Sequence, residues 1–294
     1  MMPARRGRPR GFAPWNPRAD TLALLACVAQ VLTEYAAYLP LTIRQVFYRL
    51  VGTVDYDKTE QAYSRLCETM GRARRAGLIR FDAIRDDGGT RHEADAWASP
   101  DDWLNGVAVA ARRFTLDRQE GQAVRLWLLC EAAGMAPMLA RAANPYGVAV
   151  LSSGGFDSLT AKHDLARELA GAGRTEVLHI GDHDPSGVHL FTALSEDVGA
   201  MVRGLGGPVP TFTRLAVTEA QIAALGLPTA PPKPTDRRAF TGDTVQAEAI
   251  PPDVLSRMVA DAIAARQDAA IRAAVLDREG EARASLLWRL GVQA

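Results

Sequence analysis

The 294-residue sequence contains only three cysteines, and their placement argues against two kinds of scaffold. Cys27, Cys67 and Cys130 are scattered without a Cys-x-x-Cys pair, so we expect neither a disulfide framework nor a zinc ribbon. Long apolar runs are also missing. The longest, residues 21–32, includes Gln30 and is shorter than the roughly 18 residues that a membrane-spanning helix requires. No transmembrane segment is expected.

A secretory signal is not expected either. The apolar run follows a basic pair, Arg5 and Arg6, but Asp20 and three prolines intervene and no small-residue cleavage site follows. With the dispersed cysteines, this favours a reducing, cytoplasmic compartment. Apolar residues make up 48% and charged residues 23% of the chain, as in ordinary folded proteins and unlike disordered or coiled-coil chains.

Lysine is scarce as well, and the charge is unevenly distributed. Lys58, Lys162 and Lys233 are three of 34 cationic residues, and the net charge is zero. Residues 1–80 hold 13 Lys and Arg against 6 Asp and Glu, a balance of +7, and residues 81–294 hold 21 against 28, a balance of −7. The basic part suggests a polyanionic partner, and the acidic part suggests carboxylates with a chemical role.

The first 19 residues are rich in Pro, Gly and Arg and have little to bury, which predicts a flexible basic tail. Residues 6–10 (Arg-Gly-Arg-Pro-Arg) resemble the core of an AT-hook, whose arginines enter a narrow, A·T-rich minor groove. Arg6, Arg8 and Arg10 also fit a plain basic tail attracted to phosphates without sequence preference. Both interpretations make the tail a DNA contact.

The following segment has the pattern of a winged-helix domain. Helical spacing of apolar residues predicts three helices, and the second begins at Thr42, where Gln45 completes a capping-box pattern. An alternating strand or wing then precedes an Asp-Asp-Gly-Gly turn. The expected ranges are 21–39, 42–51 and 59–76 for the helices and 78–84 for the strand.

Four arginines gather where the third helix ends and the predicted wing begins: Arg72, Arg74, Arg75 and Arg80. Winged-helix modules meet DNA at such a place. The alternative is a solvated helix end whose positive charges are stabilised by the helix dipole.

From residue 122 the pattern changes to short apolar runs separated by helical segments, which predicts a parallel α/β sheet flanked by helices. Ser99-Pro100 begins a helix, to about residue 117, that leads into this second domain. Residues 252–290 are predicted to be amphipathic helix used for packing or dimerisation. The expected strands are 124–130, 148–151 and 177–180, and the expected regions are a tail (1–19), a mostly α domain (20–98), a linker helix (99–121) and an α/β domain (122–294).

Three carboxylates follow these apolar runs. Glu131 comes directly after the first run, and Asp182 and Asp184 follow the third. Reactive groups in parallel sheets lie beyond the carboxyl ends of the strands, and Mg²⁺ prefers sparse carboxylate sites of this kind. The alternative makes Asp184 a helix N-cap before Pro185 and Asp182 a surface turn residue. His183, between the aspartates, is expected to point away from them.

Two segments about fifty residues apart carry a resemblance to a known fold. Residues 129–133 (Leu-Cys-Glu-Ala-Ala) and 181–187 (Gly-Asp-His-Asp-Pro-Ser-Gly) resemble a Toprim domain, the metal-binding fold shared by topoisomerases, primases and some nucleases. More narrowly, residues 20–265 resemble the A subunit of DNA topoisomerase VI and the related meiotic double-strand-break proteins. Further counterparts are 151–158, 214–222 and 232–237. The resemblance implies a Toprim domain after a winged-helix domain, with Mg²⁺ on Glu131, Asp182 and Asp184.

The same family has a catalytic tyrosine in an Arg-x-x-[Tyr/Phe]-Tyr motif, which residues 44–48 (Arg-Gln-Val-Phe-Tyr) match. The resemblance therefore makes Tyr48 the candidate nucleophile. On a helical wheel, Arg44 and Tyr48 lie together at the edge of the buried face. A guanidinium there is expected to lower the pKa of the phenol and to neutralise the attacked phosphate. Without the motif, such a tyrosine is an ordinary packing residue.

The resemblance implies an enzyme that breaks, and possibly rejoins, double-stranded DNA. The phenolate of Tyr48 attacks a backbone phosphorus and leaves a 5′-phosphotyrosine link and a free 3′-hydroxyl. The resemblance also implies a homodimer, in which each tyrosine meets the partner's acids, and a location at the nucleoid. No Gly-x-x-x-x-Gly-Lys-[Ser/Thr] motif is present, so complete strand passage needs a separate ATPase subunit.

Two other functions fit the sequence. A Toprim nuclease of defence or repair would use water as the nucleophile, with Tyr48 only packing or binding DNA. A DNA-binding module with a degenerate site is disfavoured by the intact set of acids. Relatives often carry a lysine where this chain has Gly154, and the roles of Lys233, Asp236 and Arg237 stay open between DNA contact and an internal ion pair.

Overall fold

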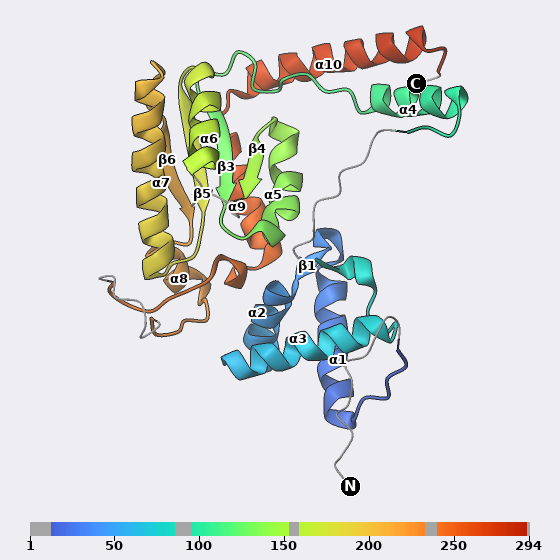
Figure 1. Cartoon of the computed structure of the whole chain (residues 1–294), viewed down its shortest axis with the longest axis vertical. Coiled ribbons are helices and arrows are strands. Elements are labelled where there is room, and N and C mark those ends of the chain that lie inside the picture. Colours follow the sequence, from blue (N-terminus) through green and yellow to red (C-terminus); the bar gives the residue numbers. More distant parts are fainter. Residues whose placement is uncertain (1–12, 86–95, 153–158, 233–239, 293–294) are drawn as a thin grey trace.

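In the computed structural model, which describes residues 13–85, 96–152, 159–232 and 240–292, a parallel sheet of four strands lies at the centre of the larger part of the molecule (Figure 1). The strand order is β4-β3-β5-β6, and every neighbouring pair is parallel. The predicted parallel α/β sheet is confirmed. The edge strand β6 was not predicted as a strand. The strands are β3 (Arg125–Cys130), β4 (Ala149–Ser152), β5 (Thr175–Ile180) and β6 (Thr211–Ala216).

Helices surround this sheet and form the rest of the fold. In chain order they are α1 (Ala19–Glu34), α2 (Ile43–Val54), α3 (Glu60–Arg75), α4 (Pro100–Arg112), α5 (Ala136–Ala143), α6 (Leu159–Gly171), α7 (Pro185–Gly204), α8 (Glu219–Leu225), α9 (Pro252–Ala264) and α10 (Ala269–Arg289). Among the described residues, no helix combines the length and the apolar character needed to cross a bilayer.

Different helices cover the two faces of the sheet because side chains alternate along each strand. On one face, Trp127 and Leu129 of β3 pack in a cluster with α6 and α7. On the other face, Leu126 and Leu128 pack with α5 and α9. Figure 1 shows these helix pairs on opposite sides of the strands. Two-sided burial leaves the strand ends as the place where polar groups of the sheet meet solvent.

The three predicted N-terminal helices are confirmed as α1, α2 and α3. The capping box is present: the backbone N–H of Gln45 donates to Thr42 Oγ1 at 3.0 Å, and that of Thr42 donates to Gln45 Oε1 at 2.9 Å. Thr59 caps α3 in a similar way, since its hydroxyl accepts from the Ala62 N–H at 3.1 Å. These caps begin α2 and α3 at the residues that the sequence pattern indicates.

The strand predicted over residues 78–84 is wrong for most of its length. Residues 81–83 form a 3₁₀ turn, closed by Arg80, whose Nε donates to Asp82 Oδ1 at 2.8 Å. Only β2 (Ile84–Arg85) is extended, and it pairs in parallel with β1 (Leu41–Thr42) instead of in a local hairpin. Burial of Ile84 against Leu41 outweighs the local alternation. The predicted turn at 86–89 lies outside the described residues.

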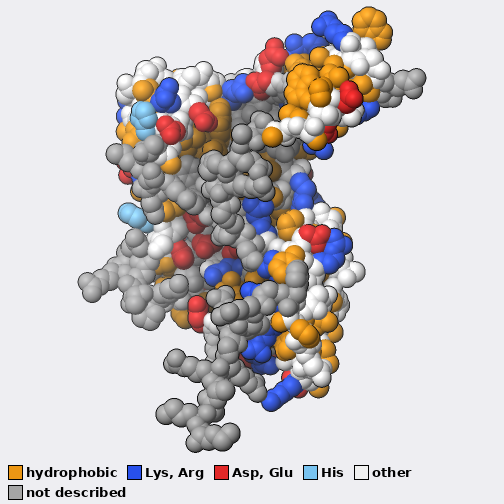
Figure 2. Space-filling model, turned by 45° about the vertical axis from the view of Figure 1, so that its right-hand side comes forward, with side chains coloured by type: hydrophobic (Ala, Val, Ile, Leu, Met, Phe, Trp, Pro, Cys, Tyr) orange, Lys and Arg blue, Asp and Glu red, His pale blue; other side chains and the backbone are white. Residues whose placement is uncertain are grey.

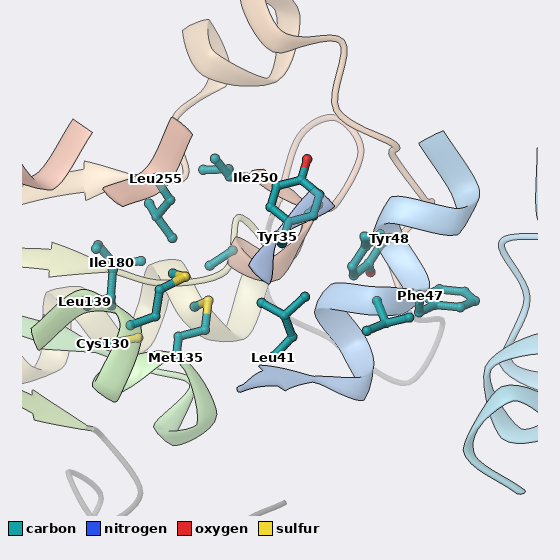
Figure 3. Packing of buried hydrophobic residues seen from close by; sticks show 14 of the residues in the cluster. Tyr35, Leu41, Phe47, Tyr48, Cys130, Met135, Leu139, Ile180, Ile250 and Leu255 are labelled. Carbon is teal, nitrogen blue, oxygen red and sulfur yellow. The ribbon is translucent and has the colours of Figure 1, made fainter. Parts of the chain in front are cut away.

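One apolar core joins the N-terminal helices to the sheet (Figure 3). Buried Leu41 and Tyr35 belong to the same cluster as Met135, Cys130 and Ile180 near the ends of the strands. The predicted regions 20–98 and 122–294, which residues 99–121 separate along the chain, therefore pack against each other in space. This packing sets the position of α2 relative to the strand ends.

Helices α4 and α10 lie side by side at one end of the molecule (Figure 1). The predicted helix after Ser99 is confirmed as α4, with the Asp102 N–H donating to Ser99 Oγ at 3.1 Å, but it ends at Arg112. The single amphipathic segment expected over 252–290 is two helices. The first helix ends at Ala264, and a new helix, α10, begins after Asp268, whose side chain accepts from the Ala270 and Ile271 N–H groups.

Candidate functional site

Glu131 and Asp182 meet at the carboxyl ends of adjacent strands. Cys130 and Ile180, the last residues of β3 and β5, are paired in register, so the residues that follow them emerge together. The Asp182 N–H donates to Glu131 Oε2 at 3.0 Å. Asp182 Oδ1 accepts from the backbone N–H of Ala247 at 2.8 Å. The structure therefore confirms that these acids converge, and Asp182 is not a surface turn residue.

Asp184 is the N-cap of α7. Its Oδ1 accepts from the Gly187 N–H at 2.6 Å, and Pro185 occupies the first turn. The helix-cap alternative is thus confirmed for this residue. Capping does not remove Asp184 from the site, because its negative charge acts on Asp182 and its side chain lines the cavity described below.

The acids crowd one another. Burial, together with the charges of Glu131, Glu248 and Asp184, raises the pKa of Asp182 to about 7, against the lowering effect of the Ala247 N–H. In the described part of the chain, no three His, Cys, Asp or Glu side chains form a ready metal-binding group. Because burial and the neighbouring acids disfavour the charged form of Asp182, keeping these carboxylates together costs electrostatic free energy.

Two glycines leave space for the side chain of Glu131 and for the backbone next to it. Its carboxylate lies beside the His179 ring, with Oε1 at 3.3 Å from Nε2. A Cβ at position 181 would collide with the Glu131 carboxylate, and a Cβ at position 187 would collide with the Asp182 carbonyl oxygen. Gly181 and Gly187 are therefore required by close approach, which accounts for the glycines at both ends of the Gly-Asp-His-Asp-Pro-Ser-Gly segment.

We expect Gly181→Ala to displace the Glu131 carboxylate and to lower the free energy of unfolding by about 1–3 kcal/mol. Any stabilisation by added Mg²⁺ should be lost with it. Thermal unfolding with and without Mg²⁺ measures both effects. Gly280→Ala is the matched control, since position 280 lies inside α10 with no atom within 4 Å of an added Cβ. It should stabilise the helix slightly. If Gly181→Ala unfolds at the wild-type temperature with and without Mg²⁺, close approach at Gly181 is not required.

Tyr48 and Arg44 meet at Gln246, a residue that sequence analysis did not identify. Tyr48 Oη donates to Gln246 Oε1 at 2.7 Å, and Arg44 Nη1 donates to the same oxygen at 2.7 Å. The predicted pairing on α2 is confirmed. The predicted edge position of Tyr48 is wrong, because the segment that contains Gln246 covers α2 and leaves Tyr48 only 5% exposed.

Because burial has the larger effect, the net pKa of the Tyr48 phenol is raised in the free protein, although Arg44 lowers this pKa as expected. Burial raises the pKa of Tyr48 far above its usual range, and Arg44 opposes this only in part. The charges of Asp182, Glu248 and Tyr63 act in the same direction as burial. The free protein therefore holds a protonated phenol.

A cavity of about 360 Å³ joins these groups. It lies between α2, the start of α3, the first turn of α7 and the segment before Gln246. Its wall includes Tyr48, Arg44 and Asp184, so the tyrosine and an acid of the same chain face one void. Figure 2 shows acidic and basic side chains side by side in the hollow between the N-terminal helices and the part that contains the sheet.

Two further charged residues hold this arrangement. Arg214 of β6 donates through Nε to the Val217 carbonyl oxygen at 3.1 Å and through Nη2 to that of Gly181 at 3.2 Å and to that of Asp182, which fixes the turn that carries the acids. Glu248 accepts from Thr42 Oγ1 at 3.1 Å and lies 3.8 Å from Arg44 Nε. In the sequence, the only indication of a role for Arg214 was that residues 214–222 have counterparts in the family that the chain resembles. Gln246 precedes a short 3₁₀ helix (Ala247–Ala249) that contains Glu248, and no sequence pattern indicated a role for either residue.

His183, between the two aspartates in the sequence, is buried. Its ring packs on Phe240 with 5.1 Å between the ring centres, and its backbone pairs with Val245. Burial lowers the pKa of His183. His183 therefore joins the segment before Gln246 to the turn that carries Asp182 and Asp184.

The predicted basic cluster gathers at the end of α3, with charged and aromatic neighbours. Arg72 pairs with Glu68 at 2.8 Å, Arg80 pairs with Asp82, and the Arg74 guanidinium lies 4.7 Å from the centre of the Phe81 ring. Exposed ion pairs are weak, so they do not preclude phosphate contacts. Arg75 is at the same helix end. Arg6, Arg8, Arg10, Gly154, Lys233, Asp236 and Arg237 lie outside the described residues.

Comparison of the chain with protein-family models, with curated proteins and with solved structures found no match in any of the three. The function is therefore inferred from the residues and their geometry, together with the motif resemblance.

Proposed function

We propose that this protein breaks double-stranded DNA by tyrosine transesterification, in the manner of a type IIB topoisomerase A subunit. The observation that carries the proposal is the cavity that Tyr48, Arg44 and Asp184 line together. The charge of Asp184 acts on Asp182, whose N–H donates to Glu131. A hydroxyl nucleophile, a cation for the phosphate and clustered carboxylates are the groups that this chemistry requires. A winged-helix domain followed by a Toprim domain is part of the proposal.

In the proposed step, Tyr48 loses its proton to water and its oxygen attacks a backbone phosphorus. A bond forms between Tyr48 Oη and the phosphorus, and the bond from phosphorus to the 3′ oxygen breaks. The leaving oxygen takes up a proton and becomes a 3′-hydroxyl, while the 5′ end stays linked to Tyr48. Arg44 lies one helical turn from Tyr48, where its charge stabilises both the phenolate and the phosphate.

Glu131, Asp182 and Asp184 are the residues that would hold Mg²⁺. Their donor atoms are all oxygen, as Mg²⁺ prefers, and their crowded charges favour a divalent cation. When bound, Mg²⁺ supplies charge stabilisation at the phosphate and at the leaving 3′ oxygen. Glu248 adds a further negative charge to this environment. A separate ATPase subunit would be required for strand passage, although not for breakage.

Covalent capture tests the proposal. Purified protein is incubated with end-labelled supercoiled and linear DNA and Mg²⁺, then quenched in detergent. We expect protein joined to 5′ ends, with Tyr48 identified as the attachment site by mass spectrometry after nuclease trimming. Binding with neither cleavage nor adduct would leave only a DNA-binding module.

The second candidate is a nuclease that uses water in place of Tyr48. One observation favours it: the phenol of the free protein is protonated and hydrogen-bonded to Gln246. Cleavage without an adduct in the same experiment would support this function and overturn the first.

We also propose a homodimer, because one Tyr48 breaks one strand. Trp97, Trp103 and Trp288, on and beside α4 and α10, are 52%, 49% and 81% exposed. Together they expose about 400 Å² of aromatic surface, about half of what one partner contributes to a stable interface. We expect Trp103→Ser with Trp288→Ser to shift the protein from dimer to monomer in sedimentation. Leu205→Ser, at an exposed site after α7, should leave the dimer intact. A wild-type monomer would contradict the proposal.

A further inference from the structure

The cavity beside Tyr48 contains a second cation that the proposed step does not use. Among the described lining residues, Arg44 and Lys58 are the basic ones. Lys58 precedes α3, and its Nζ lies 5.8 Å from the centre of the Tyr48 ring. Tyr48 therefore has two cations near it: Arg44 shares Gln246 Oε1 with its hydroxyl, and Lys58 lies over its ring.

The hydrogen bonding of Lys58 leaves it able to bind an anion. Its Nζ donates to the Pro228 carbonyl oxygen at 2.6 Å, and no carboxylate of the described residues lies within ion-pair distance. An ammonium group has three donors, so two stay available for another acceptor. Lys162, the other described lysine, differs because its Nζ contacts the Asp197 carboxylate at 2.6 Å.

The burial of Lys58 also favours an anion next to its Nζ, although Glu60 and Asp184 line the same cavity. Lys58 is partly buried, and burial lowers its pKa, with the charge of Asp243 acting in the opposite direction. A phosphate oxygen next to Nζ would restore the solvation that the cation lost on burial. Reacting atoms in a near-attack arrangement are about 3–3.5 Å apart, so a phosphorus at the Tyr48 hydroxyl brings its other oxygens within reach of the cavity wall.

We propose that Lys58 binds a phosphate of the DNA strand that Tyr48 attacks, in the cavity that both residues line. The inference rests on the proposed function for the identity of the ligand, a nucleic-acid phosphodiester. Arg44 and Lys58 would hold the phosphate between them, which orients the phosphorus toward the phenol oxygen. A purely structural role is the competing interpretation, since Lys58 also ties the start of α3 to Pro228.

Equilibrium binding without Mg²⁺ separates these roles. Fluorescence anisotropy of a short labelled duplex is measured in EDTA over a series of salt concentrations, with wild type, Lys58→Gln and Lys58→Arg. One lost phosphate contact lowers the slope of log K against log salt by about 1, and we expect the affinity of Lys58→Gln to fall by about tenfold. Lys58→Arg should retain most of the affinity and most of the salt slope. Lys162→Gln, the matched control, should behave as wild type.

An unchanged salt slope in Lys58→Gln would overturn the inference, even if the variant melts at a lower temperature. Because no cleavage is needed, a protein that binds through Lys58 and never cuts would overturn the proposed function alone.

Acetylation gives a second readout on the unaltered protein. N-hydroxysuccinimidyl acetate is added with and without DNA, and mass spectrometry follows each lysine. We expect DNA to slow acetylation of Lys58 at least about fivefold and to leave Lys162 unchanged. Equal rates at Lys58 with and without DNA would also overturn the inference.

Discussion

Replacing Tyr48 with phenylalanine is expected to abolish covalent capture and to lower Mg²⁺-dependent cleavage by at least about 10³-fold, because the nucleophilic oxygen is removed. The fold should survive. The aromatic ring keeps its edge contact with Phe47, with 5.3 Å between the ring centres, and Gln246 Oε1 keeps its hydrogen bond from Arg44. Loss of one hydrogen bond costs about 0.5–1.5 kcal/mol of stability.

Detergent-quenched reactions on end-labelled DNA measure this effect, with thermal unfolding of the same samples as a check on folding. Tyr63→Phe is the matched control. Tyr63 lines the same cavity and lies under the Arg44 guanidinium, 4.8 Å from its ring centre, but it has no part in the proposed step. It should still form the adduct. If Tyr48→Phe cleaves DNA at the wild-type rate, water is the nucleophile.

Asp182→Asn is expected to act in opposite directions on stability and on activity. In the metal-free protein, the charged form of Asp182 is disfavoured by burial and by its acidic neighbours. An amide of the same shape removes that charge and still accepts from the Ala247 N–H. The variant should therefore unfold at a higher temperature than wild type in EDTA at pH 8, while Mg²⁺-dependent cleavage falls by about 10²-fold or more.

The sign of the pH dependence follows from the direction of the shift. Asp182 has a pKa of about 7 in the folded protein, above the usual value near 4 for an unfolded chain. Between these two values the folded state binds a proton that the unfolded state has lost, so wild-type stability falls as the pH rises through this window. The free energy of unfolding of Asp182→Asn should exceed that of wild type only slightly at pH 4 and by about a few kcal/mol above pH 7.

Unfolding curves in EDTA from pH 4 to 8 test this dependence. Glu279→Gln is a contrasting control, because hydrogen bonds and ion pairs with Arg118 and Arg283 hold the pKa of Glu279 below its usual range. Its replacement should lower stability at neutral pH. Added Mg²⁺ should stabilise wild type and leave Asp182→Asn unchanged. Equal stabilisation of both proteins would remove Asp182 from the metal site.

Sequence patterns located the features that depend on near neighbours. The capping box at Thr42 and Gln45 involves groups three residues apart, and the apolar runs that became β3 and β5 are buried on both faces, whereas β4 at the edge is only partly buried. The Asp184 cap and its proline are similarly local. Such patterns failed at residues 78–84, where pairing of Ile84 with the distant Leu41 outweighed the local alternation.

By itself, the sequence determined the candidate nucleophile, the three acids and the parallel α/β sheet that carries them. Only the tertiary structure decided that Tyr48 is buried and protonated and that it shares a cavity with acids of its own chain. Gln246 lies 198 residues from Tyr48 along the chain, and Asp182 lies 51 residues from Glu131. The physical reason is desolvation: a pKa depends on every group packed around the side chain, and those groups come together only when the core closes.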